Sequence, residues 1–462
     1  MNTFELSPSP ENILRTFEQN LLKRNDDLAY FIGILNSIES NFSIALDAPW
    51  GAGKTFFIKQ VKMILDSFND HITSEYTNKR DQVRNTWNTT IKISEKPDIK
   101  PFISVYYDAW INDNDEDPVS SLLYTIIKSI GVDFTYEQSS GGFDILTNII
   151  DIVTGKNISD FFAKLKSPDY LEKIKEQKDL YDQINDFFES LLAEHGDKLV
   201  IFIDELDRCN PRFAVKLLER IKHYFCNSHI IFVFSVNISE LQHTVKQGYG
   251  LNFNASKYLN RFFDLKVTLP PANLENLYYQ IGLNNGTWIY ENVCKAVIDA
   301  YHFEIRDIMQ FYNLAKIVAY APMHNEARNH MFPGGDALRL SLMLIAPIVI
   351  GLKLHNQSQY EDFINGKDSS PLHDVIKSND IAISAFSDLL EENETYHLSQ
   401  NGHQNLHIVP VEDKLNEVYN ALFVYQYTNQ NYEKRIGKIK FTAETKSDLL
   451  KAISTLSPYA SY

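Results

Sequence analysis

Cysteine and basic charge are both scarce in this chain. Of its 462 residues only three are cysteines, Cys209, Cys226 and Cys294, which are too few and too scattered for a disulfide framework or a zinc site. Acidic residues outnumber basic ones and give a formal net charge of −16, so a nucleic-acid backbone would be repelled on average. These shortages favour a reducing, cytoplasmic setting. They argue against nucleic acid as a partner, although a local basic groove stays open.

Long apolar runs are also missing. The most apolar stretch, Leu340–Leu352, is interrupted by Pro347 and is shorter than the roughly 20 residues of a membrane-spanning helix. We therefore expect a buried core helix there and no transmembrane span. The first residues, MNTFELSPSPENILRTF, lack a basic segment followed by an apolar one, so we expect no signal peptide. A peripheral contact with a membrane stays open.

Apolar and aromatic residues, at 44% and 13%, are plentiful enough for two or three folded domains. Five short apolar runs predict buried strands: 41–46, 103–107, 199–203, 230–236 and 264–269. Helical patterns separate them, which predicts an α/β fold with a mainly parallel sheet sandwiched by helices. The expected divisions are an N-terminal helical lead-in at 1–40, an α/β core at 41–271, a helical lid-like domain at 272–356 and a mostly helical extension at 357–462. Within the core, 70–100 and 132–170 read as insertions, the first with at most local structure.

The stretch DAPWGAGKT, Asp47–Thr55, joins a predicted strand to a predicted helix. In a phosphate-binding loop, glycines let backbone N–H groups surround phosphate oxygens, a lysine reaches the β- and γ-phosphates, and a hydroxyl holds Mg²⁺. Gly53, Lys54 and Thr55 supply these parts. The other residues expected to contact the nucleotide are Pro49, Trp50, Gly51 and Ala52. Ala48 replaces the usual first glycine, which the loop can accommodate if the φ angle of Ala48 stays negative.

A second motif, KLVIFIDELDRCNP, follows at Lys198–Pro211. Its apolar strand ends at Asp204, where a carboxylate can join Thr55 in binding the metal. Glu205 comes next and is placed to orient the attacking water. Asp207 and Arg208 could equally belong to the site or form a structural ion pair. The two motifs together predict ATP and Mg²⁺ as cofactors, with Lys54 and Glu205 as catalytic residues.

These motifs resemble those of the KAP family of P-loop NTPases. WGAGKT, YYDAW and FIDELDRC occur in the family's order, followed by KYLNRFFDLKVTLP at Lys257–Pro270 and FEIRDIMQFYN at Phe303–Asn313. The resemblance covers roughly residues 20–355 and implies an ATP-hydrolysing switch, with anti-phage defence as the role typical of bacterial soluble members. Two residues depart from the family pattern: Asp108 stands in place of asparagine, and Glu205 in place of aspartate, which favours hydrolysis. Family members often carry transmembrane helices between the nucleotide motifs, but the corresponding Gly141–Gly155 is too short to span a membrane.

Several further residues have two interpretations each. Asn237, after the strand 230–236, is either a catalytic sensor of the γ-phosphate or the cap of a turn. Arg261 is either an arginine finger supplied to a neighbouring copy of the chain, which would make a homo-oligomer the active form, or a surface residue. Arg306 could contact the nucleotide from the helical domain. Trp110 reads as a core anchor between sheet and helix.

Three classes of function remain open from the sequence. The first is an ATP-operated conformational switch. The second is a nucleic-acid motor, which needs a basic groove. The third is a scaffold that binds nucleotide without turnover, against which Glu205 argues. No adenine-reading motif is legible, and any surface for a protein partner is expected in the C-terminal region beyond Asn356.

Overall fold

The computed structural model describes residues 7–93, 96–115, 117–130, 184–225, 227–283, 289–320, 335–378, 383, 411–428, 430–437 and 439–454. The predicted insertion at 132–170 and the stretch Gly141–Gly155 lie outside these residues. The chain forms two compact units that meet in sequence between Asn276 and Leu277.

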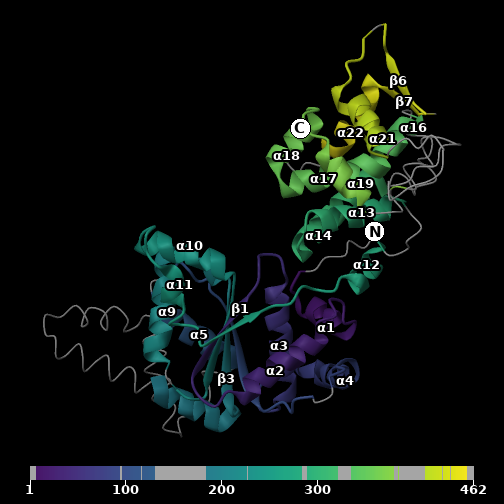
Figure 1. The fold of residues 1–462 in the computed structure, drawn as a ribbon. Coiled ribbons are helices and arrows are strands. Elements are labelled where there is room, and N and C mark those ends of the chain that lie inside the picture. Colours follow the sequence, from purple (N-terminus) through teal and green to yellow (C-terminus); the bar gives the residue numbers. More distant parts are fainter. Residues whose placement is uncertain are drawn as a thin grey trace, which may run out of the picture. The chain divides into compact units, whose positions relative to one another are not determined.

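The first unit is built on a five-stranded, wholly parallel sheet, as the alternation of apolar runs and helices predicts. The strand order is β2-β3-β4-β1-β5, so one strand separates the strand before the phosphate loop from the acidic strand (Figure 1). The strands are β1 Phe42–Asp47, β2 Phe102–Asp108, β3 Lys198–Asp204, β4 Ile230–Val236 and β5 Leu265–Thr268. Because β3 and β4 are buried along their whole length, their sequences are apolar except for Lys198, Asp204 and Ser235.

Helices cover both faces of this sheet (Figure 1). One face carries α1 Pro10–Glu18, α2 Asn25–Ser37, α3 Lys54–Phe68, the short 3₁₀ turn η1 Thr77–Lys79 and α4 Arg80–Thr90. The other carries α5 Pro118–Ile130, a helical stretch at 184–195, the 3₁₀ turn η2 Leu206–Arg208, α9 Pro211–Tyr224, α10 Ile238–Tyr249 and α11 Ala255–Leu259. This arrangement brings the carboxyl ends of β1, β2 and β3 to one edge of the sheet, where the two sequence motifs lie.

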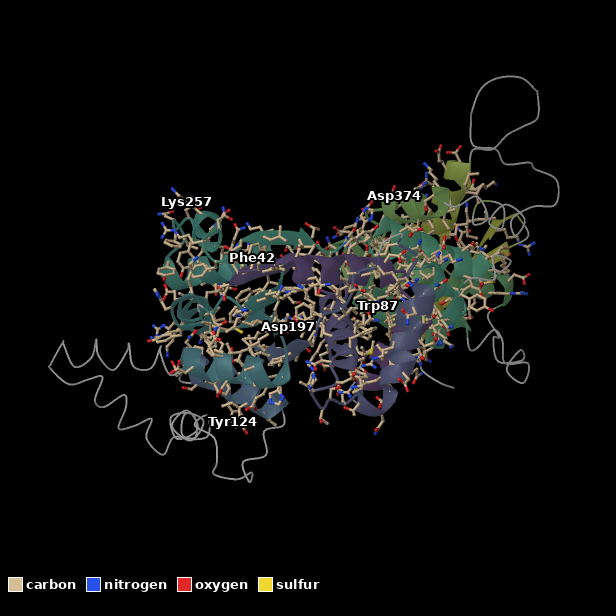
Figure 2. The ribbon with its side chains drawn as sticks, turned by 90° about the horizontal axis from the view of Figure 1, so that it is seen from below. Phe42, Trp87, Tyr124, Asp197, Lys257 and Asp374 are labelled. Carbon is tan, nitrogen blue, oxygen red and sulfur yellow. The ribbon has the colours of Figure 1, made fainter. Side chains whose placement is uncertain are left out.

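The stretch 70–100 holds more structure than its polar sequence indicates. It contains α4, an 11-residue helix that packs on α3. Trp87 is buried there, with its ring centroid 6.0 Å from that of Phe68 on α3 (Figure 2). The expectation of at most local structure was therefore wrong, because a few apolar side chains of α4 find a partner surface on α3.

The second unit is mostly helical, with one antiparallel hairpin. Its helices are α12 Glu275–Ile281 (which begins in the first unit), α13 Ile289–Ala300, α14 Ile305–Ala315, α16 Gly335–Leu340, α17 Ala346–His355, α18 Gln357–Ile364, α19 Ser370–Lys377, α21 Val411–Tyr419 and α22 Ala443–Ser454. Three π-helical turns, η3 Lys316–Tyr320, η5 Ser341–Ile345 and η6 Asn420–Val424, interrupt or extend these helices. The hairpin pairs β6 Glu433–Ile436 with β7 Ile439–Thr442.

The most apolar stretch forms the centre of this second unit. Asp336–His355 is one helical run, long and apolar enough to cross a membrane, yet 83% of its apolar window is buried inside the protein. This supports the prediction of a core helix. Pro347 does not break the run as the sequence suggests, because the π turn η5 directly precedes it: Ala346 N donates to Ser341 O, five residues back. Proline has no N–H group to donate to the preceding turn, and the wider π turn accommodates this missing hydrogen bond.

Candidate functional site

The phosphate loop begins where β1 ends. Ala48 N donates to Val236 O at 3.3 Å, so Ala48 extends the pairing of β1 with β4. Ala48 is buried and lies outside the positive-φ region, as expected for an alanine in this position. Gly51 and Gly53 both have a φ of 89°, a conformation that only glycine adopts readily. The loop therefore has its glycines at the two positions where the backbone needs them.

The loop leads into the first turn of α3, with Gly53 as the N-cap residue. The first-turn N–H groups of a helix have no partner within the helix and carry partial positive charge, which makes this end an anion-binding site. Lys54 is the first residue of α3, and its Nζ donates to Ala48 O at 2.6 Å and to Pro49 O at 3.1 Å. Burial lowers the pKa of Lys54, and the neighbouring Asp207 and Asp204 carboxylates oppose that shift.

Two predicted metal ligands meet at this edge of the sheet. Thr55 Oγ1 donates to Asp204 Oδ2 at 2.7 Å, across 149 residues of sequence. A third residue, Tyr106 on β2, donates from its hydroxyl to the same oxygen at 3.0 Å. The hydroxyl and carboxylate oxygens of Thr55 and Asp204 are the ligand types that Mg²⁺ prefers, and Mg²⁺ usually completes its shell with phosphates and water. Within the described part of the chain no set of three His, Cys, Asp or Glu side chains gathers into a metal site.

Glu205 leaves β3 in an unusual conformation. Its φ is 60°, in the left-handed region that side chains other than glycine rarely adopt. Its Oε2 accepts from Arg208 Nε at 2.5 Å. Burial, with the adjacent Asp204 carboxylate, raises the pKa of Glu205 to about 7, although Arg208 opposes the shift. Such a carboxylate can exchange a proton near neutral pH, as a residue that orients and deprotonates water must.

Asp207 and Arg208 do not pair with each other. Asp207 Oδ2 instead accepts from Trp50 Nε1 at 2.6 Å and from the backbone N of Asn237 at 3.1 Å. Burial raises the pKa of Asp207, and these two donors counter the shift. The Trp50–Asp207 bond ties the phosphate loop to the turn after β3.

Trp110 is not the core anchor that the sequence suggests. Its side chain is 52% exposed, because β2 ends at Asp108 and the chain turns outward there. Asp108 Oδ1 accepts from the backbone N–H groups of Trp110 and Ile111, both at 3.1 Å, and stabilises that turn. Trp110 instead lies beside Arg208, whose guanidinium carbon is 5.6 Å from the Trp110 ring centroid.

Arg24 is a site residue that the sequence does not reveal. It lies just before α2 and is almost fully buried. Its Nη1 donates to Ala52 O at 2.8 Å and its Nη2 to Pro270 O at 2.5 Å. Arg24 thus fixes a carbonyl of the phosphate loop. No local motif marks this arginine, because its partners are far away in sequence.

The remaining candidates are placed as follows. Asn237 is the N-cap of α10, and its Oδ1 accepts from Ser239 N at 3.1 Å and Glu240 N at 3.4 Å. This supports the capping interpretation, and a sensor role for the Asn237 amide stays a prediction. Arg306 lies on α14 in the second unit, and its contact with nucleotide likewise stays a prediction.

Within one chain, Arg261 and the phosphate loop lie at opposite ends of the strands of the sheet. Asp264 N donates to Ser43 O at 2.8 Å, so the segment that holds Arg261 meets the amino end of β1. The phosphate loop follows the carboxyl end of β1 at Asp47, which is about 13 Å further along the strand from Ser43. Arg261 is exposed to solvent at that amino edge. It therefore cannot reach its own chain's nucleotide site.

Comparison with known proteins agrees with this geometry. The family model described as the KAP family P-loop domain matches residues 26–282, more than half of the chain. The uncharacterized protein MJ0182 of Methanocaldococcus jannaschii is 41% identical over 56 residues, which is 12% of this chain. The matched part spans 27% of that relative's length.

Proposed function

Because the chain belongs to the KAP family of P-loop NTPases, we propose that it binds ATP at Pro49–Thr55 and hydrolyses it in a Mg²⁺-dependent reaction. The observation that carries this proposal is the hydrogen bond from Thr55 to Asp204. It brings the hydroxyl of the phosphate loop and the carboxylate of the acidic strand to the distance at which they can share one metal ion. Among the described residues none is seen to select one nucleotide base over another, and we take adenine as the default base.

Each residue of the site has a separate task in this reaction. The amides of the loop and the Lys54 ammonium hold the phosphate oxygens and offset their charge. Thr55 and Asp204 would hold Mg²⁺, which supplies charge neutralisation of the phosphates when bound. Glu205 orients a water toward the γ-phosphorus and accepts its proton. The bond from the γ-phosphorus to the bridging oxygen then breaks, and ADP and phosphate are the products.

The family resemblance favours a conformational switch that is driven by the energy of ATP hydrolysis. It also favours a cytoplasmic protein that takes part in bacterial anti-phage defence. The net charge of −16 speaks against a nucleic-acid motor. Glu205 speaks against a scaffold without turnover, because a protein that only binds nucleotide needs no carboxylate placed to orient water next to Asp204.

The test is steady-state ATP turnover by the full chain with Mg²⁺, using Lys54→Ala as the blank. We expect turnover above this blank, loss of turnover in EDTA, and a Glu205→Gln variant that binds ATP as tightly as wild type but hydrolyses it at least about 100-fold more slowly. Turnover no higher than the blank across a wide range of protein concentration would overturn the proposal.

A further inference from the structure

Arg208 lies between two exposed indole rings. Its guanidinium carbon is 5.6 Å from the ring centroid of Trp50 and 5.6 Å from that of Trp110. A planar guanidinium stacks well on aromatic faces, and two such faces restrict it far more than one. Trp50 comes from the phosphate loop and Trp110 from the turn after β2, so segments on two sides of the site fix Arg208 in place.

The residue that Arg208 holds is Glu205. Glu205 directly follows β3 and leaves the strand with a φ of 60°. The ion pair with Arg208 occupies Oε2. Within the described residues no hydrogen-bond donor contacts Oε1, so this oxygen remains to accept a hydrogen bond from water.

We propose that Arg208 is a positioning residue, which the Trp50 and Trp110 rings fix so that it aims the Glu205 carboxylate at the attacking water. This inference rests on the hydrolytic function proposed above. It also gives Trp50 a second role besides its place in the phosphate loop: the Trp50 indole contacts Arg208 with its ring and donates from Nε1 to Asp207. The loop that holds the phosphates and the carboxylate that orients water are thereby joined by a continuous set of contacts.

A purely structural arginine at this position would behave differently. Its loss would lower stability and nucleotide affinity together. Loss of a positioning residue lowers kcat and leaves binding intact, because only the geometry of the reacting water changes.

The experiment measures kcat and the Kd of a fluorescent ATP analogue for Arg208→Ala, Arg208→Lys, Trp110→Ala and Trp110→Phe in the full chain. We expect Arg208→Ala to lower kcat about 10- to 100-fold with a Kd within twofold of wild type. Arg208→Lys keeps the positive charge but loses the planar group that stacks on the indole rings. Its kcat should therefore lie between that of wild type and that of Arg208→Ala. Trp110→Ala should lower kcat several-fold, and Trp110→Phe should restore most of it because an aromatic face returns.

A double variant tests whether Arg208 acts through Glu205. In a Glu205→Gln background, Arg208→Ala should change the residual single-turnover rate by less than twofold. Unchanged or raised kcat in Arg208→Ala, or parallel losses of kcat, affinity and stability, would overturn the inference. Turnover that Glu205→Gln leaves intact would also overturn the inference, whereas wild-type turnover no higher than the Lys54→Ala blank would overturn the proposed function, so the two failures are told apart.

Discussion

At the scale of one residue, Tyr106 shows how a single hydroxyl supports the proposed metal site. Asp204 Oδ2 accepts from both Thr55 Oγ1 and Tyr106 OH. If Thr55 ligated Mg²⁺ instead, the Tyr106 hydroxyl would still hold the Asp204 carboxylate in its orientation. Burial beside Asp204 raises the pKa of Tyr106, so the hydroxyl stays a donor at any working pH. Partners of metal ligands commonly tune metal affinity in this way.

Tyr106→Phe removes this donor and keeps the ring. We expect the gain in ATP affinity that Mg²⁺ provides to fall about 10-fold, while affinity in EDTA stays unchanged. Titration of a fluorescent ATP analogue with and without Mg²⁺ measures both quantities. Tyr107→Phe is the matched control, because the neighbouring Tyr107 hydroxyl donates to Ser121 Oγ and not to the site. Equal Mg²⁺ dependence in the two variants would contradict the role of Tyr106.

Sequence alone predicts the residues whose chemistry is written into a short motif. Lys54 and Thr55 follow from the spacing of the loop, and Asp204 and Glu205 from the end of an apolar strand. Tyr106 and Arg24 escape prediction because their contacts are tertiary: Arg24 reaches Ala52 and Pro270, which lie near it only in the folded chain. The sequence marks Arg208 as a candidate but does not reveal its partners. These are Glu205 and two tryptophans, Trp50 and Trp110, that are distant in sequence.

At the scale of whole elements, the α10 helix depends on Asn237 for its first turn. A cap side chain accepts from the N–H groups that the helix leaves unpaired, and its removal typically costs about 1 kcal/mol. Asn237→Ala should therefore lower the free energy of unfolding by about 1 kcal/mol in urea titrations. Asn237→Ser should restore it, because serine caps as well as asparagine. Asn210→Ala, which removes the cap of α9, is the control with a comparable loss of stability.

The same serine variant separates capping from catalysis. Serine replaces the acceptor of Asn237 but not its amide N–H₂ group. Turnover that matches wild type in Asn237→Ser would assign Asn237 to the cap alone. A fall in turnover with unchanged stability would assign the amide to the sensor role that the sequence left open.

Helices and strands with a clear pattern of apolar residues are predicted from the sequence. Elements that form only through contacts with a neighbouring element are not. The buried strands β3 and β4 each carry an uninterrupted apolar run of five residues, which predicts a buried strand. The α4 helix is polar along most of its surface and becomes evident only because Trp87 meets α3. The helix through Pro347 continues because of a π turn, and no sequence pattern announces such a turn.

At the scale of the whole molecule, the position of Arg261 decides how many chains one active site needs. The strand order places β5 at the edge of the sheet, and Arg261 precedes its amino end. Since the phosphate loop follows the carboxyl end of β1, about 13 Å along the strand from the Ser43 contact, any contribution of Arg261 to catalysis must be made at the site of a second copy of the chain. An arginine supplied this way offsets charge that develops on the transferred phosphoryl group.

If Arg261 acts on a second copy, turnover per chain should rise with protein concentration and Arg261→Ala should lower it by about 10³-fold, the lower end of the range for arginine fingers. Mixing then gives the decisive measurement. Arg261→Ala keeps a complete phosphate loop, and Lys54→Ala keeps the arginine, so each supplies what the other lacks. A mixture of the two inactive variants should hydrolyse ATP, because a mixed assembly contains at least one site with both parts. Turnover that is flat with concentration, together with an Arg261→Ala variant as active as wild type, would instead assign catalysis to single chains and make Arg306 the next residue to replace.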